Sequence, residues 1–459
     1  MTEKVNFSSV IKNRGFRFLW INQILVQLAY NALNFTLIIW VFKLVGSNLA
    51  VSALLLAIYL PVILFGMFAG MVVDLVDRRK IIICIDLMLA AAFLAFIFIK
   101  GSYPLILINA FFINTLAQFF MPSESSSIPM LLSKKKLFLA NSLFSLTLYG
   151  SFMIGVSIAG PILNIFGLNT IFCVGAGSLF LAFILAQNLP TIKANGQKIE
   201  IEKLFSSETV SKISRLTITE ATRTFYFIKG KLNVVAAIAL MATIQGVIGI
   251  MAVLMPGYFE KTLMIHATDS SYFVMLPLGL GMALGAILVG KVFHRYPKRT
   301  VVIPAVVAAG TLLFLIGILP SIAQFFNSTD LPAKLIRPRY FFHAPSLAFY
   351  FGIIAFLCGV SAVSIIVPCQ TLLQEATTQR NRGKIFAVLA VIMTAFSALP
   401  IILAGGLADI FGTAPILACV GIVIFTSGLL TLHPSFFFQA DHLPFRLREF
   451  LGLGHWSKA

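Results

Sequence analysis

The chain has 459 residues, of which 59% are hydrophobic and only 11% are charged, and its mean hydropathy is +0.98. Soluble domains carry about 25% charged residues, so this composition excludes an ordinary soluble protein. The apolar stretches are continuous rather than alternating, which excludes a β-barrel and predicts membrane-spanning helices. The five cysteines lie scattered in apolar segments, which indicates reduced thiols packed as small hydrophobes rather than a disulfide framework.

The formal net charge of +18 arises from cations that gather in alternate loops. The clusters lie at 4–17, 78–80, 134–136, 193–231, 291–299, 380–384 and 446–458. Because cytoplasmic loops carry an excess of Lys and Arg, this pattern places both termini in the cytoplasm and requires an even number of spans. The clusters do not lie on a separate soluble domain, so we expect no nucleic-acid partner.

Apolar runs between polar breaks predict an all-α membrane protein with twelve transmembrane helices. The expected spans are 18–42, 49–73, 81–99, 103–130, 138–164, 168–189, 233–259, 270–293, 301–319, 346–373, 384–409 and 413–433. The first run lacks a cleavage site and is too long for a signal peptide, so we expect it to remain as a span.

A polar stretch in the middle of the chain predicts two bundles of six helices. We expect an N-terminal bundle over 1–190, a cytoplasmic linker over 191–232, a C-terminal bundle over 233–436 and a cytoplasmic tail over 437–459. Sequence echoes indicate that the bundles are copies of one unit: Gly70–Arg79 is echoed at Gly290–Arg299, Phe120–Pro122 at Ile366–Pro368 and Gly160–Gly167 at Gly405–Gly412. The difference in residue number between matching segments is larger at the later echoes than at the first. This predicts an external insertion, which we assign to 320–345. Repeats of this kind are typical of transporters that bind substrate where the two repeats meet.

The loop between the second and third spans combines a glycine, two aspartates and three cations. An aspartate at a helix end beside cations can cap a neighbouring helix in one conformation and release it in another. The alternative is that the segment forms only a solvated turn. The motif consists of Gly70, Asp74, Asp77, Arg78, Arg79 and Lys80.

This motif resembles the loop motif of the major facilitator superfamily. Three further stretches, at 14–18, 121–142 and 367–384, are similar to the drug:proton antiporter-3 type of macrolide and siderophore exporters. The resemblance implies two pseudo-symmetric six-helix bundles that rock between inward-open and outward-open states. It also implies export of a small molecule, coupled to proton influx.

Four amides of the first span, Gln23, Gln27, Asn31 and Asn34, recur on one helix face. We expect this stripe to line a substrate cavity, because the first, fourth, seventh and tenth spans line it in the resembled family. Hydrogen bonding between helices explains any single amide equally well. The remaining cavity candidates are Asn114, Gln118, Gln245, Ser361, Ser364 and Thr371.

Proton coupling needs a carboxylate that can titrate within the membrane. Glu124, just after Pro122 in the fourth span, is the first candidate; its alternative role is a structural or gate hydrogen bond. Asp86 and Glu375 are further candidates, which we expect to act mainly as gate partners of Lys and Arg. Lys and Arg are absent from the depth of every predicted span, which favours a neutral or cationic amphiphilic substrate.

Other motifs point away from enzyme chemistry. The histidines do not pair at metal-ligand spacing, and neither a Ser-His-Asp set nor a Cys-x-x-Cys motif occurs, so we expect no catalytic site, metal or cofactor. The glycines of Gly279-x-Gly281-x-x-x-Gly285 predict close helix packing. The sequence thus favours a monomeric, multi-pass exporter of the plasma membrane, the inner membrane in a bacterium. The alternatives are a lipid or lysophospholipid transporter, a non-transporting receptor or a membrane-embedded enzyme.

Overall fold

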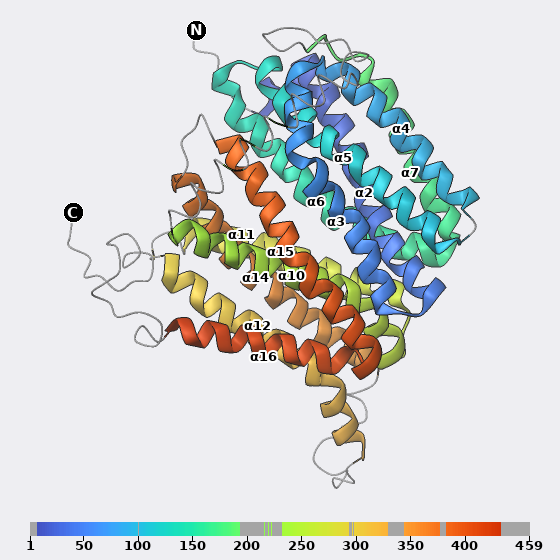
Figure 1. The fold of residues 1–459 in the computed structure, drawn as a ribbon, viewed down its shortest axis with the longest axis vertical. Helices are drawn as coiled ribbons and strands as arrows, with labels where there is room; N and C mark the ends of the chain where they lie inside the picture. The colour runs from blue at the N-terminus through green and yellow to red at the C-terminus, as the bar shows by residue number, and fades with distance from the viewer. Residues whose placement is uncertain are drawn as a thin grey trace, which may run out of the picture. The chain divides into compact units, whose positions relative to one another are not determined.

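The computed structural model describes twelve long helices and several short ones (Figure 1). Eleven of the described helices are long and apolar enough to cross a membrane, and a shorter apolar stretch, Thr413–Leu429, lies in the twelfth. This architecture confirms the predicted all-α membrane fold. The described residues are 7–99, 101–192, 232–292, 298–328, 344–376 and 382–432, with the isolated positions 215, 219, 222 and 296.

The chain divides into two compact units, which differ slightly from the two sequence halves. The first unit comprises 1–45 and 53–224, and the second comprises 46–52 and 225–459. Helix α3 therefore begins in the second unit and continues in the first. The helices that begin in the first half of the chain are α1 (Phe7–Ile11), α2 (Arg14–Val45), α3 (Asn48–Leu75), α4 (Arg78–Phe98), α5 (Tyr103–Leu131), α6 (Leu137–Phe166) and α7 (Leu168–Ala186).

The long helices of the second half end at different residues from those predicted. Helix α12 passes through Pro320 and continues to Ser328, so the insertion expected at 320–345 begins as helix. Apolar residues after Pro320 sustain it, and helices in membranes tolerate an internal proline. Residues 329–343, most of the expected linker and the tail lie outside the described residues. The helices are α10 (Leu232–Gly257), α11 (Leu276–Lys291), α12 (Lys298–Ser328), α14 (Ala344–Ala376), α15 (Arg382–Phe411) and α16 (Thr413–Leu432), with π turns at Tyr258–Thr262 and Ser271–Met275.

Three helix pairs of the first unit have counterparts in the second, as expected for a repeated fold. In the first unit α2 packs on α6, and α4 packs on α5 and α7; in the second α10 packs on α15, and α12 packs on α14 and α16. The turns after α6 and α15 both use a glycine with positive φ, Gly167 at 81° and Gly412 at 87°. The echo between these segments therefore reflects the same backbone geometry, which only glycine adopts at low cost.

Glycines set the close approach of helices in the second unit. A Cβ added at Gly281 of α11 would lie 1.9 Å from the backbone oxygen of Phe356 in α14, and one added at Gly285 would lie 3.0 Å from Val360. Small residues let membrane helices approach closely enough for dispersion contacts to hold them together. The predicted packing role of this glycine motif is confirmed, and α12 and α16 use Gly310 and Gly421 in the same way.

We predict that Gly281→Ala lowers the free energy of unfolding by about 1 to 3 kcal/mol, because the methyl group forces α11 away from α14. Gly290→Ala is the matched control: it lies in the same helix, and an added Cβ there meets no atom within 4 Å. The thermal unfolding midpoints of both variants in detergent test this. Equal midpoints for the two variants would show that close approach at Gly281 contributes nothing to stability.

Candidate functional site

The amide stripe of α2 lies partly inside the first unit. Gln23 and Gln27 are buried, while Asn31 and Asn34 are half-buried. Gln23 donates to the backbone oxygen of Phe144 in α6 over 3.4 Å, and its own side-chain oxygen is buried without a hydrogen-bond partner. Asn31 donates to the backbone oxygen of Gln27 over 2.8 Å. The Gln23 side chain therefore lies at the contact between α2 and α6.

One of the two candidates on α5, Asn114, is joined to α2 through a tyrosine that the sequence pattern did not single out. The hydroxyl of Tyr30 donates to the side-chain oxygen of Asn114. Asn114 donates to the backbone oxygen of Ala110 over 2.8 Å, and Gln118 donates to the backbone oxygen of Asn114 over 3.3 Å. The first and fourth spans are therefore tied by a polar contact in which Asn114 is almost fully buried.

In the second unit, the predicted cavity hydroxyls bond to their own helix. Gln245 of α10 donates to the hydroxyl of Thr394 in α15 over 3.2 Å. The three hydroxyl groups of α14 each donate to the carbonyl four residues earlier, at 2.8 to 3.0 Å; they are Ser361, Ser364 and Thr371. Each of these hydroxyl donors therefore already has a partner in its own helix. A cavity-lining role for Ser361, Ser364 and Thr371 remains a prediction.

A buried carboxylate with an amide partner lies inside the first unit. Asp86 of α4 is fully buried, and one of its oxygens accepts from the side-chain amide of Asn22 over 2.6 Å. Asn22 also donates to the backbone oxygen of Ala182 in α7 over 3.0 Å, which fixes the orientation of the amide. The other oxygen of Asp86 has no hydrogen-bond partner. Asp86 is thus not a partner of Lys or Arg among the described residues, contrary to the expected interfacial gate role.

Glu124 of α5 is a second buried acid in this unit. Its side chain is 3% exposed, and one of its oxygens is buried with no hydrogen-bond partner. Asp86 and Glu124 lie on α4 and α5, which pack against each other in the first unit. Glu375 differs, because its exposed carboxylate forms an ion pair with Lys298 at the start of α12. Of the three acids selected from the sequence, Asp86 and Glu124 are the two that are buried, and they lie on neighbouring helices.

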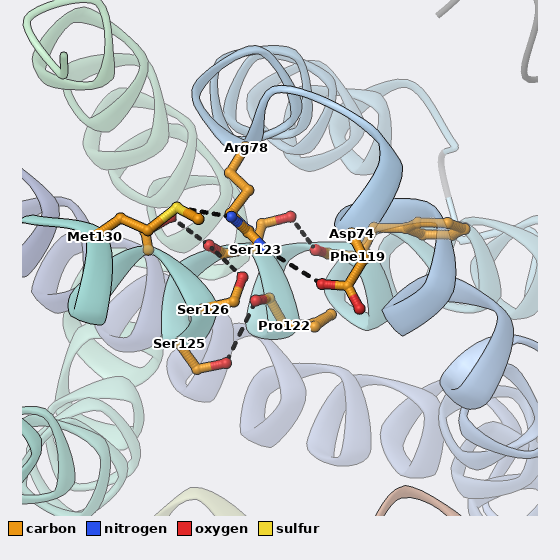
Figure 2. Close-up of polar contacts among 9 residues, drawn as sticks. Asp74, Arg78, Phe119, Pro122, Ser123, Ser125, Ser126 and Met130 are labelled. Atoms are coloured by element: carbon orange, nitrogen blue, oxygen red, sulfur yellow. Dashed lines mark hydrogen bonds and ion pairs between the residues drawn. The ribbon is translucent and has the colours of Figure 1, made fainter. Parts of the chain in front are cut away.

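In the loop motif, Arg78 reaches from the start of α4 toward α5 (Figure 2). Arg78 is 5% exposed and is paired with Asp74 at 3.2 Å, while one guanidinium nitrogen contacts the sulfur of Met130 at 2.8 Å. The Asp74 side chain is 73% exposed. In this conformation Asp74 pairs within its own segment, and capping of another helix by Asp74 remains a prediction.

Asp77 and Arg79 tie the start of α4 to the segment that follows α7. Asp77 is the N-cap of α4: its carboxylate accepts from the backbone N–H groups of Arg79 at 3.1 Å and Ile192 at 3.2 Å. Arg79 donates to the backbone oxygen of Gln187 at 2.6 Å, just beyond the C-terminus of α7, where a cation is favourable. The motif is thus more than a solvated turn. Gly70 is half-buried and Lys80 is exposed.

Sequence reasoning missed Asn22 because it lies one residue before Gln23 and therefore about 100° away from the stripe. The available signal was Asp86 itself, since a carboxylate in an apolar helix needs a polar partner on a neighbouring helix. Asn22 is a polar residue of the first span at the matching depth, and it supplies that contact.

Comparison with known proteins agrees with this architecture. The profile of the Major Facilitator Superfamily matches residues 19–399. The chain is 22% identical to the uncharacterized MFS-type transporter YfiS of Bacillus subtilis, over 85% of this chain and 86% of the relative. It is 22% identical to macrolide efflux protein A of Streptococcus pyogenes (89% and 94% covered) and 24% identical to the multidrug efflux pump Tap of Mycolicibacterium fortuitum (80% and 82% covered).

Solved structures show the same fold at low sequence identity. An auto-inhibited peptide transporter of the POT family superposes with a TM-score of 0.67 at 11% identity, covering 94% of this chain and 99% of that one. The nucleoside transporter NupG superposes with a TM-score of 0.66 at 11% identity, covering 90% and 99%. With the family profile matching most of its length, the chain belongs to the major facilitator superfamily and is a multi-pass secondary transporter of a small molecule, not an enzyme.

Proposed function

We propose that this transporter exports a neutral or cationic amphiphilic small molecule across the plasma membrane, in exchange for protons that Asp86 and Glu124 carry inward. The proposal rests on one observation: two buried carboxyl groups lie on neighbouring helices of the first unit, without a cationic partner among the described residues. The similarity to a macrolide efflux protein and a multidrug efflux pump supports the direction and the substrate class.

The distribution of cations supports a substrate without negative charge. Among the described residues, Arg78 is the buried cation, and it lies at the first residue of α4 rather than midway along a span. A desolvated anion would need a cationic or strongly donating partner deep in the protein. Amides and hydroxyls, which the α2 and α14 candidates provide, suit a neutral or cationic molecule.

The acid pair has the properties that a proton carrier requires. Ionising both groups would place two like charges in the buried interior of one unit, which is costly. Asn22 occupies one oxygen of Asp86 and leaves the other unpartnered, and Glu124 also has an unpartnered oxygen. Each acid therefore has an oxygen available to take a proton. Release becomes favourable only when a conformational change admits water.

We predict that Glu124→Gln and Asp86→Asn each abolish uphill accumulation while downhill exchange continues, because a fixed neutral side chain cannot carry a proton. Proteoliposomes with and without an imposed pH gradient measure this, with a macrolide antibiotic and the lipophilic cation ethidium as probes. We expect the accumulation ratio to fall at least about tenfold, to near one, in either variant.

Glu375→Gln is the matched control, because it neutralises an exposed acid that is paired with Lys298 and should leave accumulation unchanged. Uphill transport by both buried-acid variants would eliminate the pair as carriers. A wild-type protein that ignores the pH gradient would contradict proton coupling, and transport of a lysophospholipid in place of the two probes would favour the lipid-transporter alternative.

We also predict that substitutions of the two aspartates of the loop motif have different effects, one on the transport rate and the other on stability. Asp74→Asn should change the free energy of unfolding by less than about 1 kcal/mol, since the Asp74 carboxylate is exposed and water screens its pair with Arg78, yet it should lower the transport rate if Asp74 caps another helix during the cycle. Asp77→Ala should cost about 1 to 2 kcal/mol because it removes the cap of α4.

Thermal unfolding and initial transport rates, measured on the same preparations, separate these effects. Full transport by Asp74→Asn would remove its gating role. An unchanged unfolding midpoint for Asp77→Ala would show that its two hydrogen bonds do not stabilise the fold.

A further inference from the structure

A carboxylate at the end of α15 caps the beginning of α3. The oxygens of Asp409 accept from the backbone N–H groups of Asn48 at 2.8 Å and Leu49 at 3.0 Å. They also accept from the Ser47 hydroxyl at 2.5 Å and the Asn48 side-chain amide at 2.8 Å. All of these residues belong to the second unit. Because the first N–H groups of a helix have no partner within it, Asp409 supplies acceptors that α3 lacks.

Asp409 occupies an unfavourable position in its own helix. It lies in the last turn of α15, which ends at Phe411, and the C-terminal end of a helix carries partial negative charge. The N-terminus of α3 supplies the opposite charge. The first repeat has a neutral amide, Asn164, at the matching position before its glycine turn. The turn itself therefore does not require a carboxylate, and the charge of Asp409 is explained by α3.

The two helices also approach closely beside this cap. A Cβ added at Gly405 would lie 2.0 Å from the Ser52 hydroxyl and 2.9 Å from the backbone oxygen of Asn48. Ser52 is 1% exposed and donates to the backbone oxygen of Ile401 over 3.0 Å. We call this contact the α3 latch; it consists of Ser47, Asn48, Leu49, Ser52, Ile401, Gly405 and Asp409.

One cation lies at the same turn. The ammonium group of Lys261 donates to the backbone oxygen of Gly46 over 2.9 Å. Gly46 has a positive φ of 72°, which turns the chain into α3. The turn before the α3 latch is thus held by the second unit as well.

We propose that Asp409 is a positioning residue of the transport cycle and that the α3 latch breaks and re-forms in each cycle. Helix α3 begins in the second unit and continues into the first from Ala53. Transporters of this architecture work by moving one repeat against the other. Such a movement carries the body of α3 relative to α15, so it must either bend α3 after Ser52 or break the hydrogen bonds to Asp409. The latch lies at the end of α3 opposite to Asp74.

Hydrogen–deuterium exchange in nanodiscs reads these hydrogen bonds directly. Asp409→Asn removes the charge and turns one acceptor into a donor that faces other donors, so the Asn48 and Leu49 amides should exchange about tenfold faster or more. Gly405→Ala keeps the charge but separates the helices, and it should accelerate the same amides. Gly406→Ala is the matched control, because an added Cβ there meets its nearest atom, in Leu49, at 3.8 Å.

Spin labels test whether the latch governs the conformational cycle. The labels are placed at Lys43→Cys and Ile410→Cys, both exposed, in a chain whose five native cysteines are replaced. We expect Asp409→Asn and Gly405→Ala to shift the distance distribution toward longer values and Gly406→Ala to leave it unchanged. If Asp409→Asn does not fold, Ser47→Ala keeps the charge and removes the hydroxyl that donates to Asp409 and accepts from the Ala50 N–H, and it should give a smaller shift in the same direction.

Two results would overturn the proposal. Unchanged exchange at Asn48 and Leu49 in both Asp409→Asn and Gly405→Ala would show that Asp409 does not hold α3. Faster exchange with an unchanged distance distribution would reduce Asp409 to a local cap without a role in the cycle. Neither measurement uses a substrate or a pH gradient, so failure here is distinguishable from failure of proton-coupled export.

Discussion

The cost of placing a charge among apolar helices governs where the acids of this chain lie. With only 16 Asp and Glu in 459 residues, each acid within the helices needs a compensating environment. Asp77 caps the N-terminus of α4, and Asp409 caps the N-terminus of α3. At both places backbone N–H groups and the helix dipole favour a carboxylate. Asp74 and Glu375 are themselves exposed, and each pairs with a cation. Among the described residues, Asp86 and Glu124 have neither kind of partner, so their placement calls for a chemical explanation.

The two repeats solve the same packing problem with different polar groups. Glycine turns with positive φ follow α6 and α15, and equivalent helix pairs pack in each unit. Among the described residues, however, the buried acids are Asp86 and Glu124 of the first repeat, and the carboxylate before the glycine turn belongs to the second, where the first has Asn164. Backbone geometry is therefore shared by the repeats, while charge is not. Under the proposed function, the first unit contains the acids that carry protons, and the second unit contains the carboxylate that caps the start of α3.

Composition and periodicity predicted the spans, the repeat and the glycine packing because these depend on local chain properties. Continuous apolar runs can only be satisfied as helices in a membrane. The partners of individual side chains were not predictable, since they depend on which helix faces which. Asn22 differs from the amide stripe by one residue, yet it contacts α4 and α7 rather than α6. Asp409 belonged to a recognised sequence echo, but its partner is far away in the sequence and on another helix.

Hydropathy alone also did not predict where the ninth span ends. Polar and proline residues after 319 favoured an end to the ninth span, but α12 continues to Ser328 because its remaining backbone groups still bond within the helix. The structure likewise places an acid near each end of α3: Asp74 in its last turn, where its own dipole disfavours it, and Asp409 at its first turn, where the dipole favours it. Asp74 has one ion pair at an exposed position, whereas Asp409 has four hydrogen bonds. An ion pair with one exposed partner contributes about 0 to 1 kcal/mol; Asp409 is also exposed, and at about 0.5 to 1.5 kcal/mol for an ordinary hydrogen bond its four bonds together contribute more. The beginning of α3 is therefore held more firmly in this conformation than its end, and the end is the part free to rearrange first.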